Sequence, residues 1–77
     1  MSNALPSSLD AVYQRTHKGQ IVAAGKSSLL GHEFMLWLRM LNGLTPTRQL
    51  MNLAGASPHD ALRIVDRLRA LGLIEQR

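Results

Sequence analysis

The stretch SPHDALRIVDRLRALGLI, from Ser57 to Ile74, predicts one amphipathic helix that ends at a glycine and is followed by a short extended segment. Ser57 is a residue type that caps helix N-termini, Pro58 suits the first helical position, and Asp60 is placed to complete a capping box. The apolar residues that follow recur at the spacing of one buried helical face: Ala61, Ile64, Val65, Leu68 and Leu71. Gly72 is expected to end the helix, and the letters LIEQR predict a short edge strand after it.

A shorter helix is predicted immediately before this one. Thr45 is expected to cap it, Pro46 to occupy its first position, and Gly55 to end it. We expect its inner face to contain three apolar residues, Leu50, Leu53 and Ala54. Two helices joined by the turn Gly55-Ala56-Ser57 predict a helix-turn-helix over residues 45–72.

The first half of the chain predicts a strand and two further helices. Residues 1–8, which include the opening MSNA, are expected to be a disordered lead or a cloning remnant, and a single domain to span residues 9–77. The letters AVYQRT favour a strand, and a short helix is expected between Thr16 and Gly25. KSSLLG is typical of a linker. HEFMLWLRML then predicts a helix that is apolar on all sides except a stripe with His32 and Arg39, ended by a turn at Asn42-Gly43.

Length and composition limit the class of protein. With 77 residues the chain is long enough for one small domain, and without cysteine it can form neither a disulfide nor a thiolate zinc site. Its longest apolar run is far shorter than the roughly 20 residues that a bilayer span needs. No secretory signal pattern appears at the start. We therefore expect a cytoplasmic protein that makes no contact with a membrane.

Residues Leu44–Glu75 resemble the second helix, turn, recognition helix and first wing strand of winged-helix regulators such as the MarR and ArsR families. The matching positions are Leu50, Ala54, Ser57, Ala61, Val65, Leu68, Gly72 and Leu73. The letters VYQRTHKGQ are similar to the stretch in which such proteins leave the second wing strand and enter a helix. In that case VYQR would pair with LIEQR. The resemblance implies a mainly α, winged-helix-like domain with a small β-sheet.

The resemblance also implies a non-catalytic, DNA-binding domain of transcription regulation that acts as a dimer or as a module of a longer protein. In such proteins the early residues of the recognition helix face the major groove, which carries over to Pro58, His59, Asp60, Leu62 and Arg63. Arg63 is expected to contact a guanine and His59 a base or a phosphate, and Arg48, Arg67 and Arg69 are expected to contact phosphates. Asp60 and Asp66 would repel phosphates. The net charge of +4 attracts polyanions only weakly, and a mixed charged face is also typical of any solvated helix.

The alternative is a protein-interaction or dimerisation module that does not bind DNA. It is favoured by the acidic residues and by the missing wing hairpin after Gly-Leu-Ile, unless the N-terminal strand supplies one edge. Its candidate interface residues are Met35, Leu36, Trp37, Met40 and Leu62. The simpler interpretation places these side chains in the core of a small chain. A continuous basic surface joining Arg48, Arg63 and Arg67 would favour DNA binding, whereas an exposed apolar patch near Trp37 or Leu62 would favour a protein partner.

Other chemistries find little support in the sequence. The three histidines are far apart and lack the spacing of metal ligands. The carboxylates show no arrangement typical of acid–base catalysis, and no nucleophile elbow is present. GKSS lacks the first glycine of a phosphate-binding loop. We therefore expect no enzyme activity, no cofactor and no metal.

Overall fold

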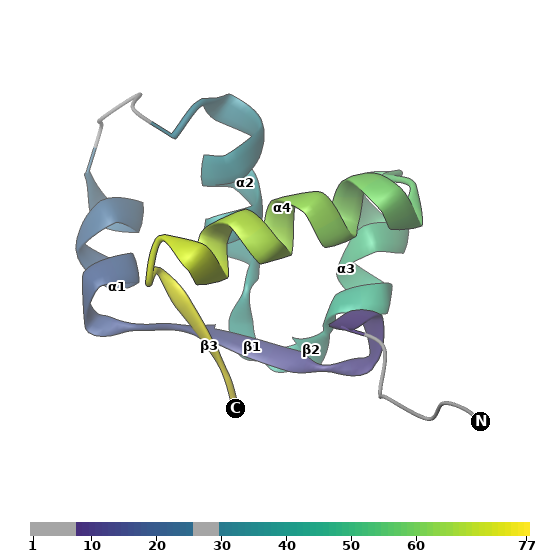
Figure 1. Ribbon diagram of the computed structural model, residues 1–77, viewed down its shortest axis with the longest axis horizontal. Coiled ribbons are helices and arrows are strands. Elements are labelled where there is room, and N and C mark those ends of the chain that lie inside the picture. The colour runs from purple at the N-terminus through teal and green to yellow at the C-terminus, as the bar shows by residue number, and fades with distance from the viewer. Residues whose placement is uncertain (1–7, 26–29) are drawn as a thin grey trace.

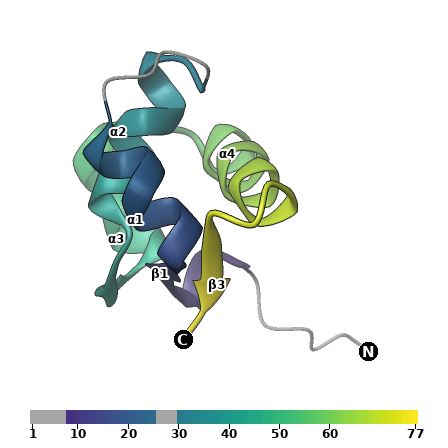
Figure 2. The same ribbon diagram turned by 90° about the vertical axis from the view of Figure 1, so that its left-hand side faces the viewer.

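The computed structural model describes residues 8–25 and 30–77. Its elements in chain order are η1 (Ser8–Asp10), β1 (Val12–Arg15), α1 (His17–Ala24), α2 (His32–Met40), β2 (Asn42–Pro46), α3 (Thr47–Ala54), α4 (Pro58–Ala70) and β3 (Ile74–Gln76). The sheet lies on one side of the molecule and the helices on the other (Figures 1 and 2). The prediction of a mainly helical domain with a small sheet is therefore confirmed.

The sheet joins the two ends of the described chain. Its strand order is β2-β1-β3, with β1 antiparallel to both neighbours. Tyr13 lies opposite Gln76 and Arg15 opposite Ile74. The expected pairing of VYQR with LIEQR is thus present, and β1 is the central strand because β2 occupies its other edge.

The strand β2 was not predicted, and the turn expected at Asn42-Gly43 is wrong. These two residues begin β2, which pairs with β1 so that Gln14 lies opposite Asn42 and Val12 opposite Pro46. Asparagine, glycine and proline disfavour strands when only local preference is considered. The pairing partner comes from the other end of the sequence, and it overrides that preference.

The start and inner face of α3 also differ from the prediction. Pro46 precedes the helix and Thr47 is its first residue, so Thr45 does not cap it. The buried side chains are Thr47, Leu50 and Met51, whereas Leu53 and Ala54 are exposed. The backbone N–H and the hydroxyl of Thr47 both donate to the carbonyl oxygen of Ala11, at 3.0 and 2.9 Å. This anchor to the segment before β1 fixes which side of α3 faces the core.

The helix α4 follows the prediction closely. The hydroxyl of Ser57 accepts a hydrogen bond from the backbone N–H of Asp60 at 3.1 Å. Four of the predicted inner residues are buried and the fifth, Leu71, is half-buried; the buried four are Ala61, Ile64, Val65 and Leu68. The turn before α4 places Gly55 in the left-handed region, with φ 68°. The helix-turn-helix therefore has α3 and α4 as its two helices.

The core contains two of the five apolar residues that the sequence also suggested for an interface. Trp37 is only 2% exposed and Met35 is buried as well, so both belong to the core and not to a surface patch. Met40 and Leu62 are half-buried, and Leu36 is about half exposed. A chain of this size needs its aromatic and long apolar side chains for its own core.

The first helix is fastened to the end of α4. The Thr16 hydroxyl accepts from the backbone N–H of Gly19, as expected of a capping residue, and also donates to the carbonyl oxygen of Gly72 at 2.7 Å. Gly19 is buried, and a Cβ at this position would lie 1.9 Å from the carbonyl oxygen of Leu73. Most of the expected linker KSSLLG lies outside the described residues. Within the described ranges, no helix has the length and apolar character needed to cross a membrane.

Candidate nucleic-acid interface

One side of the helix α4 is covered by no other element of the described residues. Figure 2 shows α4 seen along its axis on one side of the molecule, with α1, α2 and α3 together on the other. At 100° per residue, the centre of the side opposite the buried stripe is formed by His59, Asp66 and Ala70, all exposed. Arg63 flanks this line on the side of α2. A recognition helix would use this outward side.

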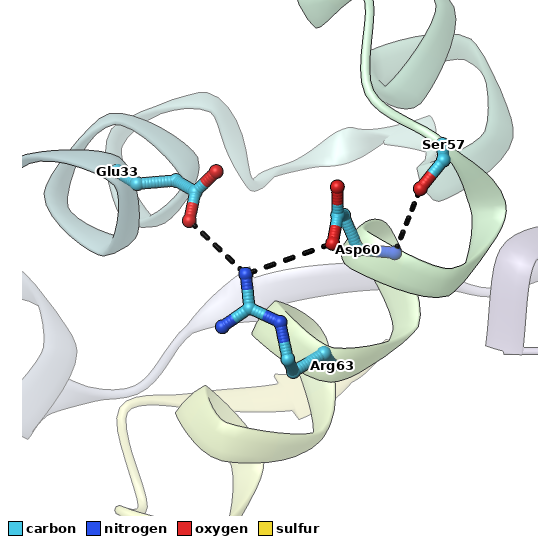
Figure 3. Close-up of polar contacts among 4 residues, drawn as sticks. All are labelled: Glu33, Ser57, Asp60 and Arg63. Atoms are coloured by element: carbon cyan, nitrogen blue, oxygen red, sulfur yellow. Dashed lines mark hydrogen bonds and ion pairs between the residues drawn. The ribbon is translucent and has the colours of Figure 1, made fainter.

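Arg63 lies between α4 and α2 and does not extend straight into solvent. Its Nη2 atom is 3.2 Å from a carboxylate oxygen of Glu33 and 3.8 Å from one of Asp60 (Figure 3). The guanidinium carbon also lies 5.7 Å from the centre of the Phe34 ring. These contacts connect the first turn of α2 to α4. Nothing in the sequence pattern pointed to Glu33 or Phe34 as partners of Arg63, because they are about 30 positions apart in the chain.

Two other predicted DNA contacts also have partners in the protein. The Nη2 atom of Arg48 lies 3.2 Å from a carboxylate oxygen of Asp10. The guanidinium carbon of Arg69 lies 5.6 Å from the centre of the Tyr13 ring. Both arginines are exposed. They lie on different flanks of the helix-turn-helix from Arg63, since Asp10 belongs to η1 and Tyr13 to β1.

The last two predicted contacts, Arg67 and His59, are exposed side chains. Among the described residues neither side chain has a hydrogen-bond or ion-pair partner. Arg67 follows Arg63 by one helical turn, so the two share the side of α4 that faces α2. Asp66 lies near the centre of the outward side. The face therefore mixes donors that suit a polyanion with one carboxylate that repels it.

The outward side of α3 adds residues that sequence reasoning missed. Gln49, Asn52 and Leu53 are exposed on this helix. Gln and Asn side chains can pair with base edges or with phosphate oxygens. A helix that begins at Thr47 buries Thr47, Leu50 and Met51 and leaves Gln49 and Asn52 exposed. The two polar residues would have been identified if the helix start had been placed correctly.

Several cations outside the helix-turn-helix bind backbone carbonyl groups. Arg15 donates to the carbonyl oxygens of Leu38 and Arg39, at 3.0 and 2.9 Å, at the end of α2. Lys18 donates to that of Leu71 at 2.9 Å, just after α4. Such carbonyls have no partner within their own helix, and the negative end of the helix dipole attracts cations. Part of the positive charge of the chain therefore stabilises the fold itself.

Neither of the two surfaces used to distinguish the functions has the predicted form. Arg48 and Arg63 are each paired with a carboxylate, so a surface joining them to Arg67 would also include Asp10, Glu33 and Asp60. Trp37 is in the core. The large apolar side chains that are most exposed in the described chain are Leu44 and Leu53, at 75% and 74%.

Within residues 8–25 and 30–77, no group of three or more histidine and carboxylate side chains is arranged to hold a metal ion. Comparison of the chain with protein-family models, with curated proteins and with solved structures gives no significant match. The helix-turn-helix and the chemistry of its outward residues are therefore the features that bear on function.

Proposed function

We propose that this chain is a winged-helix-like domain that binds double-stranded DNA without catalysis, in the manner of a transcriptional regulator. The observation that carries the proposal is the helix-turn-helix whose second helix, α4, has one side that no other described element covers (Figure 2). An exposed helix of this kind has the width that the major groove accepts.

The sheet supports the winged-helix part of the proposal. In a winged helix, the recognition helix is followed by two antiparallel strands that form the wing. Here β3 follows α4 and pairs antiparallel with β1, which leads into α1. The two strands come from opposite ends of the described chain, and no loop connects them. The arrangement agrees with the resemblance of VYQRTHKGQ to the end of a second wing strand.

The charges support binding through phosphates more than reading of bases. Arg67 has no partner among the described residues, and Arg48 and Arg69 are exposed at the flanks of α3 and α4. His59 and Asn52 offer additional donors on the outward sides. We propose that the three arginines and Asn52 contact the DNA backbone and that His59 lies nearest to the bases. Asp66 near the centre of α4 limits the affinity.

The test is a titration of a fluorescently labelled generic duplex, followed by anisotropy at about 50 and 200 mM salt. Wild-type protein is expected to bind with micromolar affinity at low salt and to weaken steeply as salt increases. Arg67→Gln should reduce the slope of log affinity against log salt by about 0.9, the value for one lost phosphate contact.

Arg39→Gln is the matched control. It removes the same charge from α2, where Arg39 donates to the carbonyl oxygen of Ala23 and lies away from the outward side of α4. Its salt slope should equal that of the wild type, and the melting temperatures of both variants should be recorded. Absence of binding at low salt would reject the proposal, and equal slopes for all three proteins would remove Arg67 from the contact surface.

The second candidate is a protein-interaction module with the same fold. Leu44 and Leu53 favour it, because each is about three-quarters exposed and neither packs against the core. Self-association is the first form to test, by light scattering over a range of protein concentrations for the wild type and for a Leu44→Ser, Leu53→Ser double variant. A dimer that the double variant loses would favour this candidate, and a monomer at all concentrations would reject self-association.

A further inference from the structure

Glu33 contacts the candidate DNA-binding face from a different helix. It is in the first turn of α2, and its carboxylate lies 3.2 Å from the Nη2 atom of Arg63 on α4 (Figure 3). Asp60 approaches the same nitrogen from within α4, at 3.8 Å. One guanidinium thus lies near two carboxylates.

The backbone position of Arg63 would allow its side chain to point outward. On α4 it lies one turn after His59 and three residues before Asp66, next to the centre of the uncovered side. Its guanidinium is displaced toward α2, where Glu33 accepts a hydrogen bond from it and the Phe34 ring lies beneath it. The contact with Glu33 therefore determines where this charge is presented.

The ion pair is exposed and can exchange its partner. The side chains of Arg63 and Glu33 are 48% and 55% exposed, and pairs of this kind contribute little to folding stability. A DNA phosphate presents the same type of acceptor to a guanidinium that a carboxylate does. Phosphate and Glu33 would therefore compete for Arg63.

We infer that Glu33 lowers the affinity of the domain for duplex DNA by holding the guanidinium of Arg63 between α2 and α4. The inference rests on the proposed function. When Glu33 is neutralised, Arg63 becomes free to contact a phosphate, and one carboxylate that repels DNA is lost. Asp60 and the Phe34 ring still attract the guanidinium, so the gain in affinity is moderate.

The experiment compares Glu33→Gln with Glu75→Gln in the same anisotropy titration. Both changes remove one negative charge and keep the size of the side chain, but Glu75 is on β3, where it accepts from Gln14. Glu33→Gln is expected to bind a generic duplex about threefold to tenfold more tightly than Glu75→Gln at 50 mM salt. Because Glu33→Gln gains one phosphate contact, its affinity should fall about threefold more than that of Glu75→Gln between 50 and 200 mM salt.

A third variant separates release of Arg63 from simple loss of repulsion. In an Arg63→Gln background, the additional gain from Glu33→Gln should disappear, since there is no guanidinium left to release. If Glu33→Gln and Glu75→Gln raise the affinity equally, or if the gain persists without Arg63, the inference is wrong although DNA binding stands. If neither the wild type nor any variant binds DNA, the proposed function fails, and the inference fails with it.

Discussion

Leu68 and Leu53 are leucines on the two helices of the helix-turn-helix, and the sequence pattern places both on an inner face. In the structure Leu68 is fully buried, whereas Leu53 is 74% exposed. The periodic pattern in α4 extends over three turns and fixes the buried side, while α3 is only two turns long and allows more than one choice. The two leucines therefore form a natural pair for mutation.

Leu68→Ala is expected to lower the free energy of unfolding by about 2–5 kcal/mol, because it leaves a cavity in the core. Leu53→Ala removes the same atoms from the solvent-exposed surface and should change the free energy of unfolding by less than about 0.5 kcal/mol. Urea denaturation of both variants and the wild type provides the comparison. Equal losses for the two variants would contradict the burial described here.

Replacing Gly19 with alanine is expected to have the opposite effect on stability to that of most glycine-to-alanine changes in helices. In a helix, alanine is normally more stable than glycine by about 0.5–1 kcal/mol. At this position a Cβ would collide with the carbonyl oxygen of Leu73, at 1.9 Å. Gly19→Ala should therefore destabilise the protein by about 1–3 kcal/mol through overpacking, which a thermal melt would detect. A higher melting temperature would show that α1 and the end of α4 are not in such close contact.

At the scale of the elements, the boundary between β2 and α3 is where local signals and structure disagree. Threonine and proline at positions 45 and 46 form a typical helix start, yet the helix begins at Thr47. Thr47 is completely buried and binds the carbonyl oxygen of Ala11 through both its hydroxyl and its N–H. The segment before β1 thus determines where α3 begins.

Thr47→Val is expected to cost about 1 kcal/mol of stability through the lost hydroxyl hydrogen bond. Thr45→Val should have almost no effect, because the Thr45 side chain has no hydrogen-bond partner among the described residues. If Thr45 were the cap, its substitution would cost about 1 kcal/mol. Chemical denaturation of the two valine variants separates the alternatives, and a larger loss for Thr45→Val would favour the helix start expected from sequence.

At the scale of the whole molecule, the sheet makes the two ends of the chain depend on each other. β1 has β2 on one edge and β3 on the other, and the backbone N–H of Arg77 donates to the carbonyl oxygen of Val12 at 2.9 Å. Ile74 on β3 is part of the core. A domain with one small core has only a few kcal/mol of net stability, so loss of one edge strand affects all of it.

Deletion of residues 74–77 is therefore expected to abolish cooperative unfolding of the entire domain. Unfolding can be followed by the fluorescence of the single tryptophan, Trp37, which lies on α2 and not on the deleted strand. Circular dichroism measures the loss of the helices. A Glu75→Ala, Gln76→Ala double variant is the control, since it keeps the strand and removes only exposed side chains. A truncated protein that retains a sharp fluorescence transition would show that β3 is dispensable.

Features that depend on neighbouring residues follow from the amino-acid sequence alone. Ser57 and Thr16 cap helices where predicted, and α4 buries four of its five predicted inner residues. These features follow from hydrogen bonds to nearby backbone groups and from helical periodicity. The outward side of α4, which carries the proposed function, was therefore predicted together with the helix.

Features that depend on residues distant in the chain follow from the packing of the elements against one another. β2 forms because β1 offers it an edge, and α3 begins at Thr47 because Ala11 accepts its hydrogen bonds. Arg63 faces Glu33 because α2 packs beside α4. Local preferences are worth about 1 kcal/mol or less per residue, and such long-range contacts outweigh them. The sequence indicated which side chains carry charge on the candidate face, and packing decided which of those charges have a partner within the protein.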